Sequence, residues 1–290
     1  MLKRNHGIDI AFELGGIGSR EDACQLFEER LAPEQLERIR KITNTEALIK
    51  IANAIVMCAP DAVFVNTGSA EDKQVIREMA LKKGEEEPLA MENHTLHYDL
   101  KEEQGRIIDR TYYIANDEEN ISSLGKRITR ADALDAVKSN LAGLMKGMTL
   151  IVGFYSRGPV GAPAADPAIE ITSSAYVSHS AEILYRNCFD SFDGEAGASG
   201  YFYTNIHSEG LNRAEDLPNA RVFMDRSYQT TYSFNCTYAG NTLLLKKGNH
   251  RFSVDRACNE LFGKQLAEHM FITGIEGPGG RITWMTGAAP

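Results

Sequence analysis

Apolar residues recur every three or four positions through the first third of the chain, which is the spacing of amphipathic helices. On this pattern we predict helices at Glu21–Arg30, Pro33–Ile42 and Asn44–Met57. The dipeptide Ala59-Pro60 ends the last of them, because proline cannot continue a helix.

A buried strand is predicted directly after these helices, at Ala62–Asn66, followed by a turn at Thr67-Gly-Ser. Ala70–Lys83 is predicted to be a helix that returns from this strand, so a strand–helix alternation begins here. The charge run Lys82–Glu87 is typical of a solvated loop.

Short apolar segments with strand character dominate the chain after Thr111. The predicted strands are Thr111–Ile114, Met148–Tyr155, Ala168–Thr172, Gly200–Asn205, Arg221–Met224, Thr230–Phe234, Thr242–Leu245, Met270–Thr273 and Ile282–Met285. Helices are predicted at Arg130–Leu144 and Asp255–His269, and a turn at Gly277–Gly280. The sequence has no internal repeat and no low-complexity linker. We therefore predict a mixed α/β (α+β) fold in which helices flank one large mixed sheet.

Composition and charge narrow the class of protein. A hydrophobic fraction of 43% and a charged fraction of 24% are ordinary for a globular protein, and no apolar run reaches membrane-spanning length. The N-terminus lacks the features of a signal peptide, so we expect a cytoplasmic protein without a membrane partner. The net charge of −9 argues against nucleic-acid binding, although a local cluster of basic residues can still hold a small anion.

Two other sequence patterns do not indicate a catalytic or binding site. The cysteines are scattered without a C-x-x-C pair, so we expect free thiols; they are Cys24, Cys58, Cys188, Cys236 and Cys258. The glycines of Gly15-Gly-Ile-Gly18 lack the third glycine of a dinucleotide-binding loop and are predicted to form a plain turn.

His94 and His97 lie three residues apart and would face a metal ion together on a helix. Their neighbours Thr95, Leu96 and Tyr98 favour an extended segment instead, in which residues three apart point to opposite faces. A structural role for both histidines is the stronger of the two alternatives.

The segment Tyr238–Lys247 carries a more specific signal. A tyrosine and a glycine allow close backbone approach to a ligand, and the paired Lys246 and Lys247 follow an apolar run. One lysine of such a pair points inward, where desolvation lowers its pKa and makes it a possible metal ligand or positioning group. The alternative is two solvated lysines at a strand end.

Two more residues have both a functional and a structural interpretation. His269 is either a second metal ligand or a histidine that ends a helix. Arg106 and Arg110 lie beside a predicted strand and are suited to bidentate binding of carboxylates, but an isolated arginine is more often a surface residue.

Several segments in a fixed order resemble the GTP-dependent phosphoenolpyruvate carboxykinase family. The segments are Met145–Pro163, Ile169–Val177, Tyr238–Lys247 and Leu266–Met270, and the similarity is greatest between Lys146 and Pro290. The resemblance implies the N-terminal lobe of the carboxykinase fold. It also implies domains at 1–264, which would bind oxaloacetate or phosphoenolpyruvate, and at 265–290, which would begin the nucleotide-binding domain.

The resemblance also implies the roles of individual residues. Arg106 would grip the substrate carboxylate, the ring edge of Tyr238 would face it, and Gly240 would contact it through its backbone. Lys247 and His269 would be ligands of a catalytic Mn²⁺, and Lys246 would lie near the reacting groups. The family usually has Tyr-Gly-Gly-Asn where this chain has Tyr238-Ala239-Gly240-Asn241, which requires a negative φ at Ala239.

The implied reaction converts oxaloacetate and GTP into phosphoenolpyruvate, GDP and CO₂ through a manganese-stabilised enolate, with Mg²⁺ or Mn²⁺ on the nucleotide, in gluconeogenesis or anaplerosis. Strand Ile282–Met285 runs into Thr286–Pro290 as a phosphate-binding loop begins, without its Gly-Lys-Ser/Thr. We therefore expect a chain that is inactive alone. The alternative is a binding module for dicarboxylates or phosphoenolpyruvate that does not transfer phosphate.

Overall fold

The computed structural model describes residues 7–103, 105, 107–119, 121, 125–161, 165–238, 242 and 270–288. The chain divides into two compact units, Lys3–His250 and a second unit of Arg251–Pro290 with Met1–Leu2. The domain boundary predicted after residue 264 lies outside the described residues and stays a prediction.

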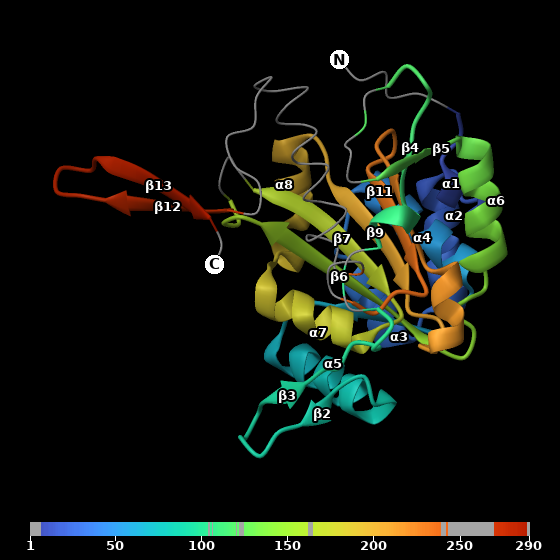
Figure 1. Ribbon diagram of the computed structural model, residues 1–290, viewed down its shortest axis with the longest axis horizontal. Helices are drawn as coiled ribbons and strands as arrows, with labels where there is room; N and C mark the ends of the chain where they lie inside the picture. The colour runs from blue at the N-terminus through green and yellow to red at the C-terminus, as the bar shows by residue number, and fades with distance from the viewer. Residues whose placement is uncertain are drawn as a thin grey trace. The chain divides into compact units, whose positions relative to one another are not determined.

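The first unit is built on a large mixed sheet. Its strands are β1 (Ala62–Asn66), β4 (Thr111–Ile114), β5 (Lys126–Ile128), β6 (Thr149–Arg157), β7 (Asp166–Thr172), β8 (Arg186–Asn187), β9 (Tyr203–Ser208), β10 (Arg221–Asp225) and β11 (Thr230–Phe234). Within the described residues these nine strands have the order β1-β6-β7-β9-β11-β10-β4-β5, with β8 paired to β6 (Figure 1). β7, β9 and β11 run parallel to one another, whereas β6–β7 and β10–β11 are antiparallel. The predicted fold class is confirmed.

Helices flank this sheet. They are α1 (Ile10–Gly15), α2 (Arg20–Arg30), α3 (Pro33–Ile39), α4 (Thr45–Cys58), α5 (Ala70–Lys83), α6 (Arg130–Asn140), α7 (Ala175–Leu184) and α8 (Phe192–Ser199), with short 3-10 turns at Ile108–Arg110, Phe189–Ser191 and Ala214–Asn219. Side-chain caps fix where several of them begin: Ser19, Asn44, Ser69, Thr129 and Ser174 each accept a hydrogen bond from a backbone N–H of the first turn.

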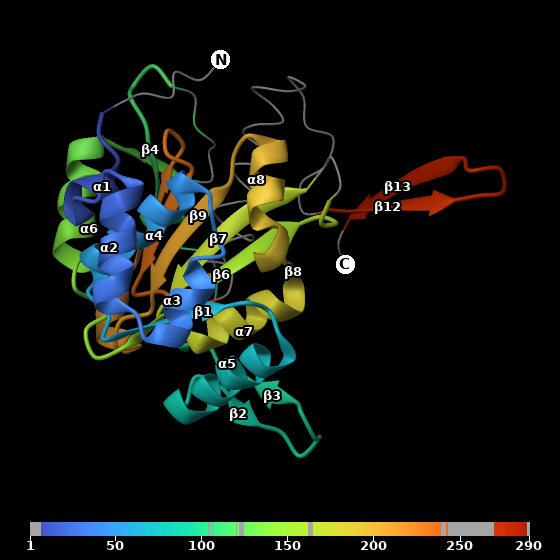
Figure 2. The ribbon, with the colours of Figure 1, turned by 180° about the vertical axis from the view of Figure 1, so that it is seen from behind.

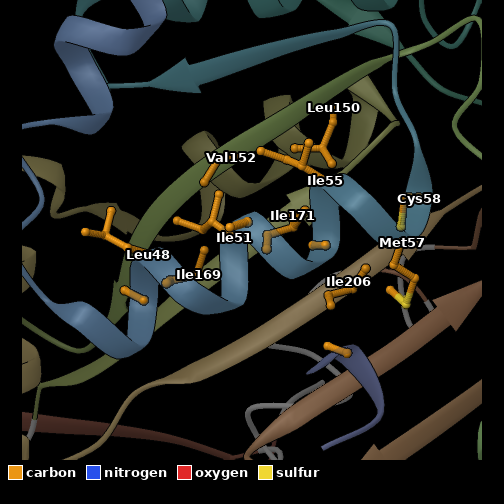
Figure 3. Close-up of a cluster of buried hydrophobic side chains, with 14 of the residues drawn as sticks. Leu48, Ile51, Ile55, Met57, Cys58, Leu150, Val152, Ile169, Ile171 and Ile206 are labelled. Carbon is orange, nitrogen blue, oxygen red and sulfur yellow. The ribbon is translucent and has the colours of Figure 1, made fainter. Parts of the chain in front are cut away.

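The main core lies between α4 and one face of the sheet. α4 carries Leu48, Ile51 and Ile55 on the side that faces the sheet, all of them buried (Figure 3). Alternate residues of the sheet, among them Val152 and Ile171, meet this helix, because successive strand residues point to opposite faces. α1, α2, α3 and α6 add residues to the same cluster, and the view from behind shows α2, α3 and α4 in front of the sheet (Figure 2).

The opposite face of the sheet carries an apolar cluster near β1 and β6. There Phe64 and Ile151 pack against Ile76 and Ala80 of α5 and Ala175 of α7. The short hairpin of β2 (Glu87–Pro88) and β3 (Thr95–Leu96) lies beside α5 in both views (Figures 1 and 2). Further along this face β7, β9 and β11 carry buried polar residues, among them Glu170, Asn205 and Thr231.

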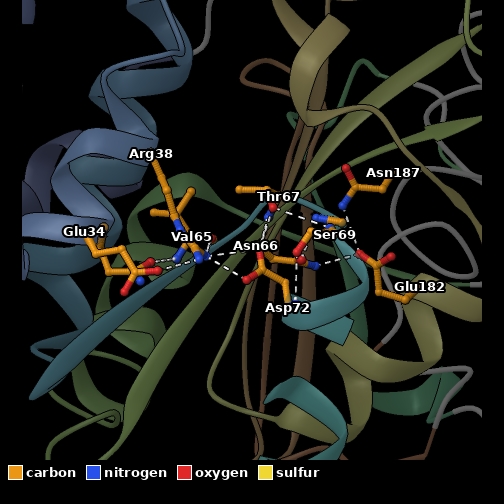
Figure 4. Close-up of polar contacts among 11 residues, drawn as sticks. Glu34, Arg38, Val65, Asn66, Thr67, Ser69, Asp72, Glu182 and Asn187 are labelled. Atoms are coloured by element: carbon orange, nitrogen blue, oxygen red, sulfur yellow. Dashed lines mark hydrogen bonds and ion pairs between the residues drawn. The ribbon is translucent and has the colours of Figure 1, made fainter. Parts of the chain in front are cut away.

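A buried carboxylate joins β1 to α5 (Figure 4). Asp72 Oδ2 accepts hydrogen bonds from Thr67 N at 2.8 Å and Thr67 Oγ1 at 2.6 Å. Arg38 Nη1 lies 2.9 Å from Asp72 Oδ1 and also donates to the carbonyl of Val65. These bonds fix the turn between the strand and the helix, and they tie α3 to it.

Most predicted elements of the first unit are confirmed, and several bounds are as predicted, including β1, α5, β4 and β11. α1, α7 and α8 were not predicted, and α6 ends at Asn140 instead of Leu144. β9 begins at Tyr203 instead of Gly200, because Gly200 adopts φ 68° and caps α8. Gly15 ends α1, and Gly16 caps it at φ 75°, so this glycine segment forms a plain turn as predicted.

The second unit contains an antiparallel hairpin of β12 (Met270–Glu276) and β13 (Ile282–Ala288), joined by the turn predicted at Gly277–Gly280. Four of the cysteines are free thiols, as predicted, and Cys258 lies outside the described residues. No helix among the described residues is both long and apolar enough to cross a membrane.

Candidate functional site

A buried carboxylate ties the segment before position 106 to the segment that leads into Tyr238. Glu103 Oε2 accepts hydrogen bonds from Thr237 N at 2.7 Å and from Thr237 Oγ1 at 3.0 Å. On the other side of position 106, Ile107 packs in one buried cluster with Cys236. Residues that flank both expected substrate-binding positions are therefore in contact with each other.

Strand β9 holds the Tyr238 segment at two further points. Asn205 and His207 alternate with core residue Ile206, so their side chains lie on the polar face of the sheet. His207 Nε2 donates to the carbonyl of Cys236 at 2.9 Å, and Asn205 Nδ2 donates to the carbonyl of Thr242 at 2.9 Å. These two anchors lie before and after Tyr238, so β9 fixes both ends of the turn.

A backbone hydrogen bond joins Tyr238 to Thr242 and closes the turn between them. Thr242 N donates to the carbonyl of Tyr238 at 3.2 Å, a bond that spans four residues, and Tyr238 is half-buried. The strand predicted at Thr242–Leu245 is therefore wrong at Thr242, which is helical, and its other residues lie outside the described part of the chain.

A row of polar residues crosses three neighbouring strands below this turn. Glu170 of β7 and Thr231 of β11 are the register partners of Asn205, so all three side chains lie on one face. Asn205 Nδ2 also donates to Glu170 Oε1 at 2.6 Å, and all three residues are almost fully buried. Burial, and then the nearby Glu170 carboxylate, raise the pKa of Tyr185. These three residues form a buried polar row on the face of the sheet that points away from α4.

Hydrogen bonds fix the tautomer of His207. Because Nε2 donates to a carbonyl, Nδ1 carries no proton in the neutral ring and accepts from Thr172 Oγ1 at 2.8 Å. Complete burial lowers the pKa of His207 to about 4, because a charged ring would be poorly solvated there. His207 is therefore a neutral structural donor at neutral pH.

The charge run at 82–87 is only in part the solvated loop that was predicted, because Lys82 and Lys83 end α5. Glu85 and Glu86 are buried, and Lys83 forms ion pairs with Glu85 and with Glu209. Glu85 Oε2 also accepts from Ser174 Oγ at 2.9 Å and Tyr176 N at 2.6 Å, which secures the start of α7. Burial and the neighbouring carboxylate of Glu85 raise the pKa of Glu209 to about 8.

His94 and His97 do not form a pair. His97 stacks on Tyr176 with ring centroids 3.5 Å apart, whereas the Nδ1 of exposed His94 lies 2.9 Å from the carbonyl of Glu92. The segment between them is the strand β3, as the extended prediction requires. Among the residues that the structure describes, no three His, Cys, Asp or Glu side chains form a group suited to a metal ion.

Of the predicted site residues, Tyr238 is described and lies within the anchored turn. The others lie outside the described residues and stay predictions: Arg106, Ala239, Gly240, Asn241, Lys246, Lys247 and His269. Sequence reasoning missed the three residues that anchor the turn, namely Glu103, Asn205 and His207. The available signal was an amide at the end of the predicted strand Gly200–Asn205 and an imidazole two residues after it.

Comparison with known proteins shows which family the chain belongs to. Residues 50–258 match the family model of the phosphoenolpyruvate carboxykinase N-terminal domain, which is more than half of the chain. The chain belongs to the phosphoenolpyruvate carboxykinase family. The carboxykinase match covers the whole large sheet, both segments joined by Glu103 and Thr237, and the anchored turn.

Curated relatives carry the same family name. The chain is 38% identical to "Phosphoenolpyruvate carboxykinase [GTP]" of Thermococcus sibiricus over 91% of its own length. It is 36% identical to the carboxykinase of Saccharolobus solfataricus over 93% of its own length. It is 28% identical to the carboxykinase of Treponema pallidum over 87% of its own length. In each case the chain spans 42% of the length of the carboxykinase it matches.

Proposed function

We propose that this chain supplies the part of a GTP-dependent phosphoenolpyruvate carboxykinase that binds oxaloacetate and phosphoenolpyruvate. One observation carries the proposal: two hydrogen bonds from Thr237 to Glu103 join the chain segments that lead to Arg106 and Tyr238. These are the positions at which the family resemblance expects contacts to the substrate carboxylate.

In the proposed site Arg106 binds the carboxylate through two parallel hydrogen bonds, which fixes the orientation of the substrate as well as its position. Tyr238 and the backbone of Gly240 complete the contacts, and Lys246 lies near the reacting groups. Holding oxaloacetate in one orientation aligns its breaking C–C bond with the carbonyl π system. Mn²⁺ bound by Lys247 and His269 would supply Lewis-acid stabilisation of the enolate oxygen.

Phosphoryl transfer from GTP, with Mg²⁺ or Mn²⁺ on the nucleotide, belongs to the proposed activity of the whole protein. Its products are phosphoenolpyruvate, GDP and CO₂, as in gluconeogenesis or anaplerosis. We place the reaction in the cytoplasm.

The test is titration calorimetry of the 290-residue chain with oxalate and with phosphoenolpyruvate in the presence of Mn²⁺. The proposal predicts saturable binding of both anions. Acetate should bind little, because it has no oxygen outside its one carboxylate group with which to chelate the metal. Failure of both oxalate and phosphoenolpyruvate to bind a folded chain would contradict it.

A further inference from the structure

We propose that Asn205 is a positioning residue of the substrate site, which holds Tyr238 in place through Thr242. The inference rests on the proposed function, because that function assigns Tyr238 to the substrate. Asn205 would act on the substrate through Thr242 and Tyr238.

The first argument is the direction of the hydrogen bonds. Asn205 Nδ2 donates to the carbonyl of Thr242 at 2.9 Å and to Glu170 Oε1 at 2.6 Å. Both partners are acceptors, so only the amide nitrogen satisfies them, and the orientation of the amide is fixed. An aspartate has the same shape but has no donor for either partner.

The second argument is where the bond to Thr242 acts. Thr242 also donates its N–H and its Oγ1 to the carbonyl of Tyr238, at 3.2 and 3.3 Å. Asn205, Thr242 and Tyr238 therefore form a continuous chain of hydrogen bonds from β9 to the expected substrate contact. Loss of the Asn205 donor would release the end of the turn and leave a buried carbonyl without its partner.

The third argument is the rigidity of the support. Asn205 lies in the middle of the sheet, between its register partners Glu170 and Thr231. Its side chain is held by Glu170 from the next strand, so its rotamer is fixed independently of the turn. A side chain on a central strand, itself oriented by a neighbouring side chain, can fix the position of a functional loop more precisely than contacts within the loop alone.

The chain offers a matched pair of variants that separates the anchor from the strand-to-strand bond. In Glu170→Gln, Asn205 still donates to residue 170 and to the Thr242 carbonyl. In the double variant Glu170→Gln with Asn205→Asp, the amide at 170 donates to the carboxylate at 205, but nothing donates to Thr242. The two variants differ in one donor toward the turn, and each retains a hydrogen bond between β7 and β9.

Two measurements on the full chain test the proposal: calorimetric affinity for oxalate with Mn²⁺, and amide hydrogen exchange of the peptide that contains Tyr238–Thr242. We expect the double variant to bind oxalate about tenfold more weakly than Glu170→Gln, with similar melting temperatures. Exchange in the Tyr238–Thr242 peptide should be faster in the double variant. Asn53→Asp is the control for general destabilisation. Asn53 lies on α4, which packs on the other face of the sheet, and its Nδ2 donates to the Ile17 carbonyl at 2.9 Å.

Equal oxalate affinity and equal exchange in Glu170→Gln and the double variant would overturn the proposal. A similar loss of affinity in Asn53→Asp would also overturn it, because the effect would then follow stability. If the wild-type chain does not bind oxalate, the proposed function fails. The exchange measurement then decides by itself whether Asn205 holds the turn.

Discussion

Thr237 donates two hydrogen bonds to one oxygen of Glu103, although 134 residues separate the two in the chain. Both residues are buried, at 3% and 2% exposure, so these bonds are not exchanged for water. The contact joins two segments that are distant in sequence at the point where the family resemblance expects them to bind one carboxylate.

We predict that Glu103→Ala lowers the free energy of unfolding by about 1–3 kcal/mol, because Thr237 loses the acceptor for two buried donors. Glu103→Gln retains an oxygen acceptor and should lower the free energy of unfolding by about half as much as Glu103→Ala. Urea unfolding measures both. Equal stability of the alanine variant and the wild type would show that the contact contributes nothing.

Arg38 allows a comparison of a buried and an exposed ion pair on one guanidinium (Figure 4). Its partner Asp72 has a side chain that is 2% exposed, whereas the side chain of Glu34 is 72% exposed. Asp72→Ala should cost about 3–5 kcal/mol, because Arg38 and Thr67 lose a buried partner. Glu34→Ala should change stability by less than about 1 kcal/mol. Similar losses in the two variants, measured by chemical denaturation, would contradict this explanation.

Gly153 of β6 lies beside a buried tyrosine. A Cβ at this position would lie 2.5 Å from Cε2 and 2.7 Å from Oη of Tyr155, and Tyr155 is fully buried. Gly153→Ala should therefore destabilise the chain by about 1–3 kcal/mol through overpacking. Gly194 in α8 is the control, since a Cβ there meets no atom within 4 Å. A thermal melt of Gly153→Ala that matches the wild type would refute the prediction.

His207 should make stability depend on acidic pH. Its pKa is about 4 in the folded chain and about 6.5 when unfolded, so below pH 6.5 the unfolded state takes up a proton first. Its contribution is complete above pH 6.5 and is lost as the pH falls toward 4, by about 3 kcal/mol at most. His207→Gln should flatten this part of the stability profile, whereas exposed His94→Gln should not. Parallel profiles for His207→Gln and the wild type between pH 6.5 and 4 would contradict the account.

Periodicity was sufficient to predict elements whose signal is local. β1 and α5 have the predicted bounds, because an apolar run ends at a turn and a capped helix follows. α8 was not predicted, because Gly194 and Gly197 lower its helix propensity. The helix is stabilised instead by the burial of Phe192 in the main core. Tertiary packing of this kind leaves no periodic pattern in the sequence.

The anchors of the candidate site could not be predicted for a different reason. A strand with polar residues at alternate positions, such as Asn205 and His207, has the same pattern whether that face is solvated or covered. The structure shows that both side chains are buried and that each donates to a backbone carbonyl. Glu103 gave no signal, since its partner Thr237 is distant in sequence. Tyr238 was predicted through the family resemblance instead of through periodicity.

The most direct test of the central claim is the affinity of the chain for phosphoenolpyruvate in Arg106→Ala, compared with Arg110→Ala. Arg110 donates to the carbonyl of Leu217 and serves as the matched control for loss of a nearby arginine. The account predicts that Arg106→Ala weakens binding by a factor of about 30 or more, because one charged partner of the carboxylate is removed. Arg110→Ala should leave the dissociation constant within about threefold of the wild type. Saturable binding that is unchanged in Arg106→Ala would contradict the claim that this chain binds its substrate as a carboxykinase does.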